Sequence, residues 1–154
     1  MYGVSQIDIS EDVTVVTLNN MPLSVGVAAS VFARMGEAGV LIDMVSQTSP
    51  IGDRVNISFT CPDKDLRNVL DITKQAKEQH PNVTSLASSG NAKIQLYGDE
   101  MRKQSGVFAR ALSALSDAGV EPQLITTSEV DISLLVTAHC LPGAKAALEA
   151  AFEL

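Results

Sequence analysis

One pattern of hydrophobic and polar positions occurs twice along the chain, over residues 26–48 and again over residues 106–128. In each copy, apolar residues recur every three or four positions and are followed by an apolar run, which predicts a helix and then a strand. Gly39 and Gly119 occupy equivalent positions after the two helices, where a left-handed cap favours glycine. A repeat of this length indicates a duplicated supersecondary unit.

The first copy lies within a predicted order of strand, helix, strand, strand, helix and strand. Asp63, just after Pro62, is expected to be the N-cap of the second helix. This order is that of a ferredoxin-like βαββαβ unit, an α+β fold whose four-stranded antiparallel sheet carries two helices on one face. The predicted strands cover residues 13–18, 40–47, 54–60 and 83–87, and the helices cover 25–38 and the stretch from Pro62 toward His80.

The second copy lies in a unit that is one strand short, with strands over 92–97, 121–126 and 130–138 and helices over 106–118 and 142–152. Residues 2–9 alternate as a strand does, and Ser10-Glu-Asp12 is expected to end that strand. A missing strand would leave backbone groups unpaired. We therefore predict that the N-terminal strand completes the second sheet, so that a first unit (13–88) is inserted into a second unit (1–9 plus 90–154).

The composition and charge exclude several classes of partner. The chain has 154 residues, of which 45% are hydrophobic, and a formal net charge of -7 at pH 7. Nucleic acids and anionic membranes are bound by basic surfaces, so we expect neither as a partner. Without a long apolar segment or a signal-peptide pattern, we expect a cytoplasmic protein. We then expect Cys61 and Cys140 to be reduced and to pack in the core as small hydrophobic side chains.

The sequence offers no set of residues for catalysis or metal binding. His139 and Cys140 are adjacent, but the other histidine, His80, lies far along the chain, and a structural metal needs about four ligands. No Ser-His-Asp set or glycine-rich phosphate loop is recognisable. We therefore expect no metal, no cofactor and no catalytic residue, which makes a small enzyme the weakest interpretation.

Several segments resemble ACT domains and, more narrowly, the regulatory region of aspartokinases. They are the helix start at Gly26-Val-Ala-Ala29, the strand around Ile42-Asp-Met-Val-Ser-Gln47, the segment Ile57-Ser-Phe-Thr-Cys-Pro62, the segment Leu124-Ile-Thr-Thr-Ser-Glu129 and the ending Ala147–Leu154. The resemblance covers nearly the whole chain and implies the nested arrangement of two ACT units. It implies a non-catalytic module, resembling the beta subunit or a stand-alone relative, that senses an amino acid for feedback control of biosynthesis.

The resemblance also implies partners. They are free lysine or threonine, bound at interfaces between ACT units, a second copy in a homodimer, and an aspartate kinase catalytic subunit. The alternative is an assembly module whose ligand pocket has degenerated. Val25 and Ser105 stand where the family usually has proline, and Glu121-Pro122 replaces the usual Asn-Ile or Asn-Val, which favours that alternative.

An amino acid carries a carboxylate and an ammonium, and two segments of the chain suit both groups. Backbone N–H groups at a helix N-terminus suit the carboxylate, while carbonyls, side-chain amides and Glu129 suit the ammonium. In the alternative, these residues only form turns, an oligomer interface and a solvated carboxylate. The candidate ligand-binding residues are Asn20, Val25, Gly26, Val27, Ala28, Ile42 and Gln47 in the first copy, and Ser105, Gly106, Val107, Thr126, Thr127, Ser128 and Glu129 in the second.

Overall fold

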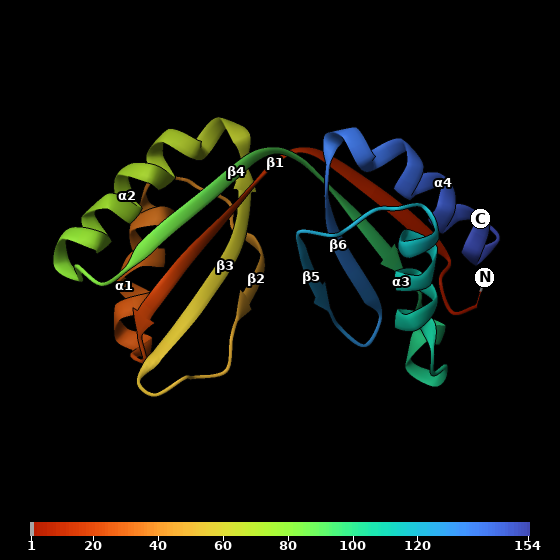
Figure 1. Cartoon of the computed structure of the whole chain (residues 1–154), viewed down its shortest axis with the longest axis horizontal. Helices are drawn as coiled ribbons and strands as arrows, with labels where there is room; N and C mark the ends of the chain where they lie inside the picture. Colours follow the sequence, from red (N-terminus) through yellow and green to blue (C-terminus); the bar gives the residue numbers. More distant parts are fainter. Residues whose placement is uncertain (1) are drawn as a thin grey trace. The chain divides into compact units, whose positions relative to one another are not determined.

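The computed structural model describes residues 2–154, and its strands and helices are those of the predicted α+β fold (Figure 1). Met1, the first residue of the predicted second unit, lies outside the described residues. The strands are β1 (Gln6–Pro22), β2 (Asp43–Gln47), β3 (Arg54–Pro62), β4 (Thr84–Tyr97), β5 (Leu124–Thr127) and β6 (Asp131–Thr137). The α-helices are α1 (Val25–Glu37), α2 (Leu66–Gln79), α3 (Val107–Asp117) and α4 (Leu141–Phe152), with short 3₁₀ turns at Asp63–Asp65, Asp99–Lys103 and Ala138–Cys140.

The two units are nested along the chain. The hydrogen-bonded strand order is β2-β3-β1-β4-β6-β5, and β1 and β4 each contribute to both units. The first unit comprises Asp12–Ser89, and the second comprises the described part of Met1–Glu11 together with Gly90–Leu154. Each unit therefore has four strands and two α-helices, and the first is inserted into the second.

The core of the first unit lies between its sheet and the helices α1 and α2. In β1, Val16 and Leu18 are fully buried at alternate positions, which is the period of a strand with one face in the core. Val31 and Met35, one helical turn apart on α1, pack into the same cluster. The ring of Phe32 meets that of Phe59 edge to face, with centroids 5.2 Å apart.

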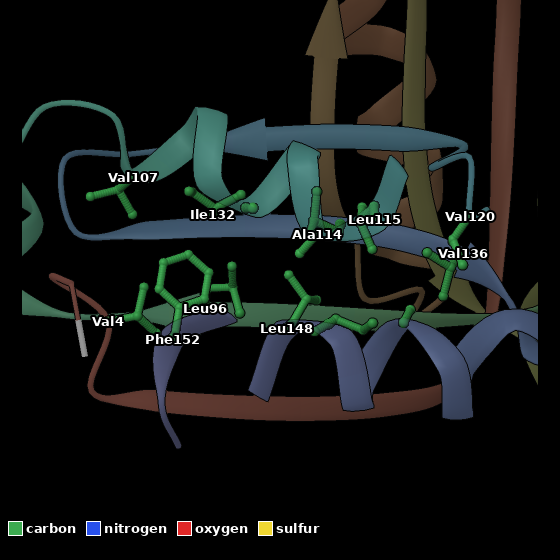
Figure 2. Packing of buried hydrophobic residues seen from close by; sticks show 14 of the residues in the cluster. Val4, Leu96, Val107, Ala114, Leu115, Val120, Ile132, Val136, Leu148 and Phe152 are labelled. Carbon is green, nitrogen blue, oxygen red and sulfur yellow. The ribbon is translucent and has the colours of Figure 1, made fainter. Parts of the chain in front are cut away.

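The core of the second unit repeats this plan with α3 and α4 (Figure 2). Ala92, Ile94 and Leu96 are fully buried at alternate positions of β4. Leu115 of α3 and Leu148 of α4 pack against them. Small residues on both helices, Ala111, Ala114 and Ala144, are buried in this core and let the helices lie close to the sheet.

The N-terminal segment belongs to the second unit. Val4 is 1% exposed and lies beside Leu96 and Phe152 in the core (Figure 2). The backbone N–H of Ser5 donates to the carbonyl of Tyr97 at 2.8 Å. Gly98 makes room for this segment, because a Cβ there would overlap the carbonyl oxygen of Gly3 and lie 2.8 Å from its carbonyl carbon.

Tyr2 is held by both helices of the second unit. Its hydroxyl donates to Glu153 Oε1 at 3.3 Å, just after α4. The guanidinium of Arg110, on α3, lies 3.6 Å from the centre of the Tyr2 ring, which is a cation–π contact. The same Arg110 donates through Nη1 to the carbonyl of Ala151 at 3.1 Å. The N-terminal segment is thus held in place by side-chain contacts as well as by backbone hydrogen bonds.

The structure corrects four local predictions. Ser10-Glu-Asp12 does not end a strand: β1 continues through it, with Asp12 at a φ of 55°. Likewise, β4 continues through Gly90, whose φ is 72°, where two strands were predicted. The strands expected from residues 40 and 121 begin only at Asp43 and Leu124.

The fourth correction concerns Asp63. It lies in a 3₁₀ turn before α2, where the N-cap is Asp65, and neither Pro62 nor Asp65 makes a side-chain capping bond. Asp63 instead accepts a hydrogen bond from Thr14 Oγ1 at 2.6 Å. The predicted glycine caps are confirmed, since Gly39 and Gly119 have φ values of 76° and 69°. Within residues 2–154, no helix has the length and apolar character needed to cross a membrane.

We predict that Gly98→Ala destabilises the second unit by about 1–3 kcal/mol, the usual cost of overpacking. The added methyl would push the Gly3 carbonyl away and loosen the N-terminal segment. Urea unfolding followed by circular dichroism, with amide hydrogen exchange in residues 92–96, measures the effect.

Gly143→Ala is the matched control, because Gly143 lies within α4 and an added Cβ would have no atom within 4 Å. Alanine in a helix should be neutral there or stabilise by up to about 1 kcal/mol. Equal unfolding free energies for the two variants would contradict the packing of Gly3 on Gly98.

Candidate functional site

The N-terminus of α3 opens onto a hollow of about 390 Å³ in the second unit. Gly106 precedes the helix with a φ of 83°, a left-handed conformation that favours glycine. Because glycine has no side chain, it cannot cap the N–H groups of the first helical turn, which have no partners within the helix. The hollow therefore has backbone donors at the positive end of a helix dipole. Its lining residues are Met101, Arg102, Gln104, Gly106, Val107, Phe108, Thr127, Ser128, Glu129 and Ile132.

The floor of the hollow is part of the core. Val107 and Ile132 both belong to the buried cluster of the second unit and lie toward the same end of it (Figure 2). Val107 is 6% exposed and Ile132 is 2% exposed. The helix N-terminus and the end of the sheet are thus held by packing, which gives the hollow a fixed apolar base.

The turn from Ser128 to Asp131 forms a rigid wall. The hydroxyl of Ser128 donates to Asp131 Oδ1 at 2.6 Å and accepts the backbone N–H groups of Val130 and Asp131, each at 3.2 Å. Gln95 Nε2 donates to the other carboxylate oxygen of Asp131 at 2.7 Å. The serine of the Thr-Ser-Glu segment therefore stabilises the turn through its hydroxyl group.

Two opposite charges lie in the lining of the hollow. Arg102 Nη1 donates to Glu129 Oε2 in an ion pair whose side chains remain 54% and 77% exposed. Exposed pairs of this kind contribute about 0–1 kcal/mol to stability. The charges of Arg102 and Glu129 cancel, so the lining is formally neutral. It presents one cation and one anion to a ligand that carries both charges.

A second, smaller hollow of about 290 Å³ lies at the N-terminus of α1 in the first unit. Here the helix is capped, since Ser24 Oγ accepts the N–H of Val27 at 3.3 Å. Gly26 and Val27 line this hollow together with Gln79 and His80 at the end of α2. One of its backbone donors is therefore already satisfied by the protein.

The structure brings together more of the second candidate set than of the first. Gly106, Val107, Thr127, Ser128 and Glu129 share the α3 hollow, whereas Ser105 and Thr126 do not line it. Of the predicted residues of the first unit, Gly26 and Val27 line the α1 hollow. Asn20, Val25, Ala28, Ile42 and Gln47 do not line the α1 hollow.

Asn20 has a structural role. It has a φ of 62°, its N–H donates to Asn56 Oδ1 at 2.9 Å, and its Nδ2 donates to the carbonyl of Asn82 at 3.1 Å. These bonds hold an irregular end of β1, where the pairing with β3 shifts register between Leu18 and Met21. Gln47 is exposed at the end of β2.

Five lining residues are absent from the candidate set, and the charged one among them is Arg102. It lies between the strand predicted over 92–97 and the helix predicted over 106–118, in a 3₁₀ turn, and no periodic pattern links it to Glu129. Across residues 2–154 the structure shows no cluster of three or more His, Cys, Asp or Glu side chains arranged to hold a metal ion.

The two cysteines differ in environment. Cys61 is 3% exposed in the core of the first unit, while Cys140 is only partly buried. Burial raises the pKa of the Cys61 thiol, and with a smaller contribution from the nearby carboxylates of Asp65 and Asp63 that pKa reaches about 11. Because the thiolate is the nucleophile, Cys61 is unreactive at neutral pH.

Comparison with known proteins identifies the type of module. A family model described as an ACT domain matches residues 13–76 and again residues 94–152. An aspartokinase of Mycolicibacterium smegmatis is 37% identical over 156 aligned positions, which cover 100% of this chain and 36% of that protein. An aspartokinase of Corynebacterium glutamicum is 36% identical, with the same coverage. The chain thus spans about a third of the length of these curated relatives.

The fold agrees with solved structures. The ligand-free regulatory subunit of aspartate kinase from Thermus thermophilus superposes with a TM-score of 0.87 at 25% identity, covering 97% of this chain and 99% of that one. The aspartate kinase of Synechocystis superposes with a TM-score of 0.91 at 23% identity, covering 98% of this chain and 27% of that one. The chain therefore matches nearly the whole of the Thermus thermophilus regulatory subunit and only part of the Synechocystis kinase.

We predict that only Cys140 reacts with a thiol reagent such as Ellman's reagent in the native protein at pH 8. Cys61 is excluded by burial and, with a pKa of about 11, is about one-thousandth ionised at that pH. Native protein should therefore release about one equivalent of thiol product, and denatured protein two, since both cysteines are free.

The Cys140→Ser variant is the control and should give almost no rapid reaction when native. Rapid labelling of Cys61 in that variant would show that the first unit opens readily, and would contradict the burial of this side chain.

Proposed function

The chain belongs to the ACT domain family, and from that premise we propose that it is an amino-acid-sensing regulatory module of the aspartate kinase type. It carries two copies of the domain, as the matches to residues 13–76 and 94–152 require. The observation that supports sensing is the α3 hollow, which combines uncapped backbone donors, an acid and an apolar base. We propose lysine or threonine as the effector.

The chemistry of the α3 hollow suits the head group of an amino acid. Its volume of about 390 Å³ is within the range usual for small-molecule sites. The carboxylate of the ligand would accept hydrogen bonds from the N–H groups of Val107 and Phe108, where the helix dipole adds a favourable field. The ammonium would face Glu129. Thr127 and Gln104 provide further polar atoms for a side chain that ends in a hydroxyl or an ammonium.

The second candidate function is assembly. β2 and β5 are at the two ends of the strand order, so each has one edge without a partner in the described chain. On β2, Val45 is 54% exposed, and Leu41 just before it is 76% exposed. An exposed edge with apolar side chains favours pairing with another chain. The partner would be a second copy of this chain or a kinase catalytic subunit.

We predict that either L-lysine or L-threonine raises the melting temperature of the purified protein, and that most of the twenty amino acids do not. A ligand present at about 100 times its Kd stabilises the native state by about 2.7 kcal/mol. Thermal unfolding followed by circular dichroism against each amino acid is the measurement. A set of twenty unchanged melting temperatures would leave assembly as the better function.

We also predict which amides respond to the bound amino acid. Nitrogen–hydrogen correlation spectra should show the largest shifts at Val107, Phe108 and Ala109, because these N–H groups lie in the uncapped first turn of α3. The capped turn at Val27 and Ala28 is the internal control. Larger shifts there than in α3 would place the effector in the first unit instead.

A further inference from the structure

We infer that Arg102 occupies the ammonium position of the α3 hollow when no amino acid is bound, and so acts as an internal competitor of the effector. This inference rests on the proposed function, because it assigns the mechanism by which that same site sets its affinity. It is carried by the ion pair between Arg102 and Glu129, both of which line the hollow.

An ammonium group bound in the hollow has few carboxylates to face. Glu129 is the one carboxylate in its described lining, and Asp131 just beyond is bonded to Ser128 and Gln95. An amino acid whose carboxylate lies on the α3 N-terminus needs an acceptor for its ammonium nearby. Glu129 meets that need, but the guanidinium of Arg102 already donates to it.

A guanidinium and an ammonium make the same kind of charge-assisted hydrogen bond to a carboxylate. Binding of the effector must therefore exchange one cation for the other at Glu129, and Arg102 must turn away. Both side chains are more than half exposed, so solvent compensates much of the lost interaction. The exchange then lowers the affinity by a modest factor rather than blocking the site.

The position of Arg102 makes this exchange mechanically simple. It lies in the 3₁₀ turn Asp99–Lys103, outside the regular strands and helices that hold Val107 and Ile132. Its side chain can move without disturbing the core beneath the hollow. Glu129, in contrast, is fixed at the base of its side chain by the Ser128 turn.

The test measures the binding of L-lysine and L-threonine by titration calorimetry to the whole chain and to three variants. Arg102→Gln removes the competitor and should tighten binding of the effector about twofold to fivefold, the range that an exposed ion pair allows. Glu129→Gln removes the ammonium acceptor and should weaken binding about tenfold or more. Competition at Glu129 requires these opposite signs, and the control below separates it from a general effect of charge.

Lys103→Gln is the matched control. It removes the same charge from the adjacent residue, whose Nζ lies 3.6 Å from Glu100 Oε1, and Lys103 does not line the hollow. Its affinity should equal that of the unmodified chain. If the Arg102→Gln variant binds with the same affinity as this control, the inference is overturned. If it binds more weakly than the control, the inference is also overturned, and Arg102 is a contact of the ligand. In both cases the proposed function would stand.

Two further outcomes separate the inference from the proposed function. If only the Arg102→Gln variant binds lysine or threonine, competition is supported, and the unmodified chain is not a sensor of either. If no variant binds either probe, both the inference and a sensing role at the α3 hollow are wrong.

Discussion

The packing of the N-terminal segment onto the end of β4 is the contact on which the nested architecture depends. Gly98 has an extended φ of -175°, which any residue can adopt. Glycine is needed there because a side chain would occupy the position of the Gly3 carbonyl. With that contact made, Val4 completes the second core and Ser5 pairs with Tyr97. A second unit without this strand would lack both a core residue and a partner for its sheet.

Because β1 and β4 run through both units, the register of each strand in one unit fixes its register in the other. β1 contributes Val16 and Leu18 to the first core, and its earlier residues Ile7 and Ile9 pack against the second. A strand alternates its faces with a period of two, so a slip by one residue would expose every buried side chain on that strand. Asp12 and Gly90, both at positive φ, lie at the limits of the units and adjust each strand locally without ending it.

The sequence predicts the architecture better than it predicts the site, for physical reasons. The helices and glycine caps follow from local sequence patterns. The missing strand follows from counting the strands that each sheet needs to pair its backbone groups. The residues Ser10-Glu-Asp12 favour turns and so predict a break, but β1 continues through them between its hydrogen-bonded neighbours β3 and β4. Arg102 escaped prediction because its partner, Glu129, lies 27 positions along the chain with no repeating pattern between them.

The two copies of the repeat have diverged at the helix start, where only the first copy has a side-chain cap. In the first copy, Ser24 caps α1 and uses the N–H of Val27. The equivalent position in the second copy is Gln104, and α3 begins after Gly106, which has nothing to cap with. The protein therefore satisfies one first-turn N–H of α1 with its own side chain, and leaves the first-turn N–H groups of α3 to water or to a ligand.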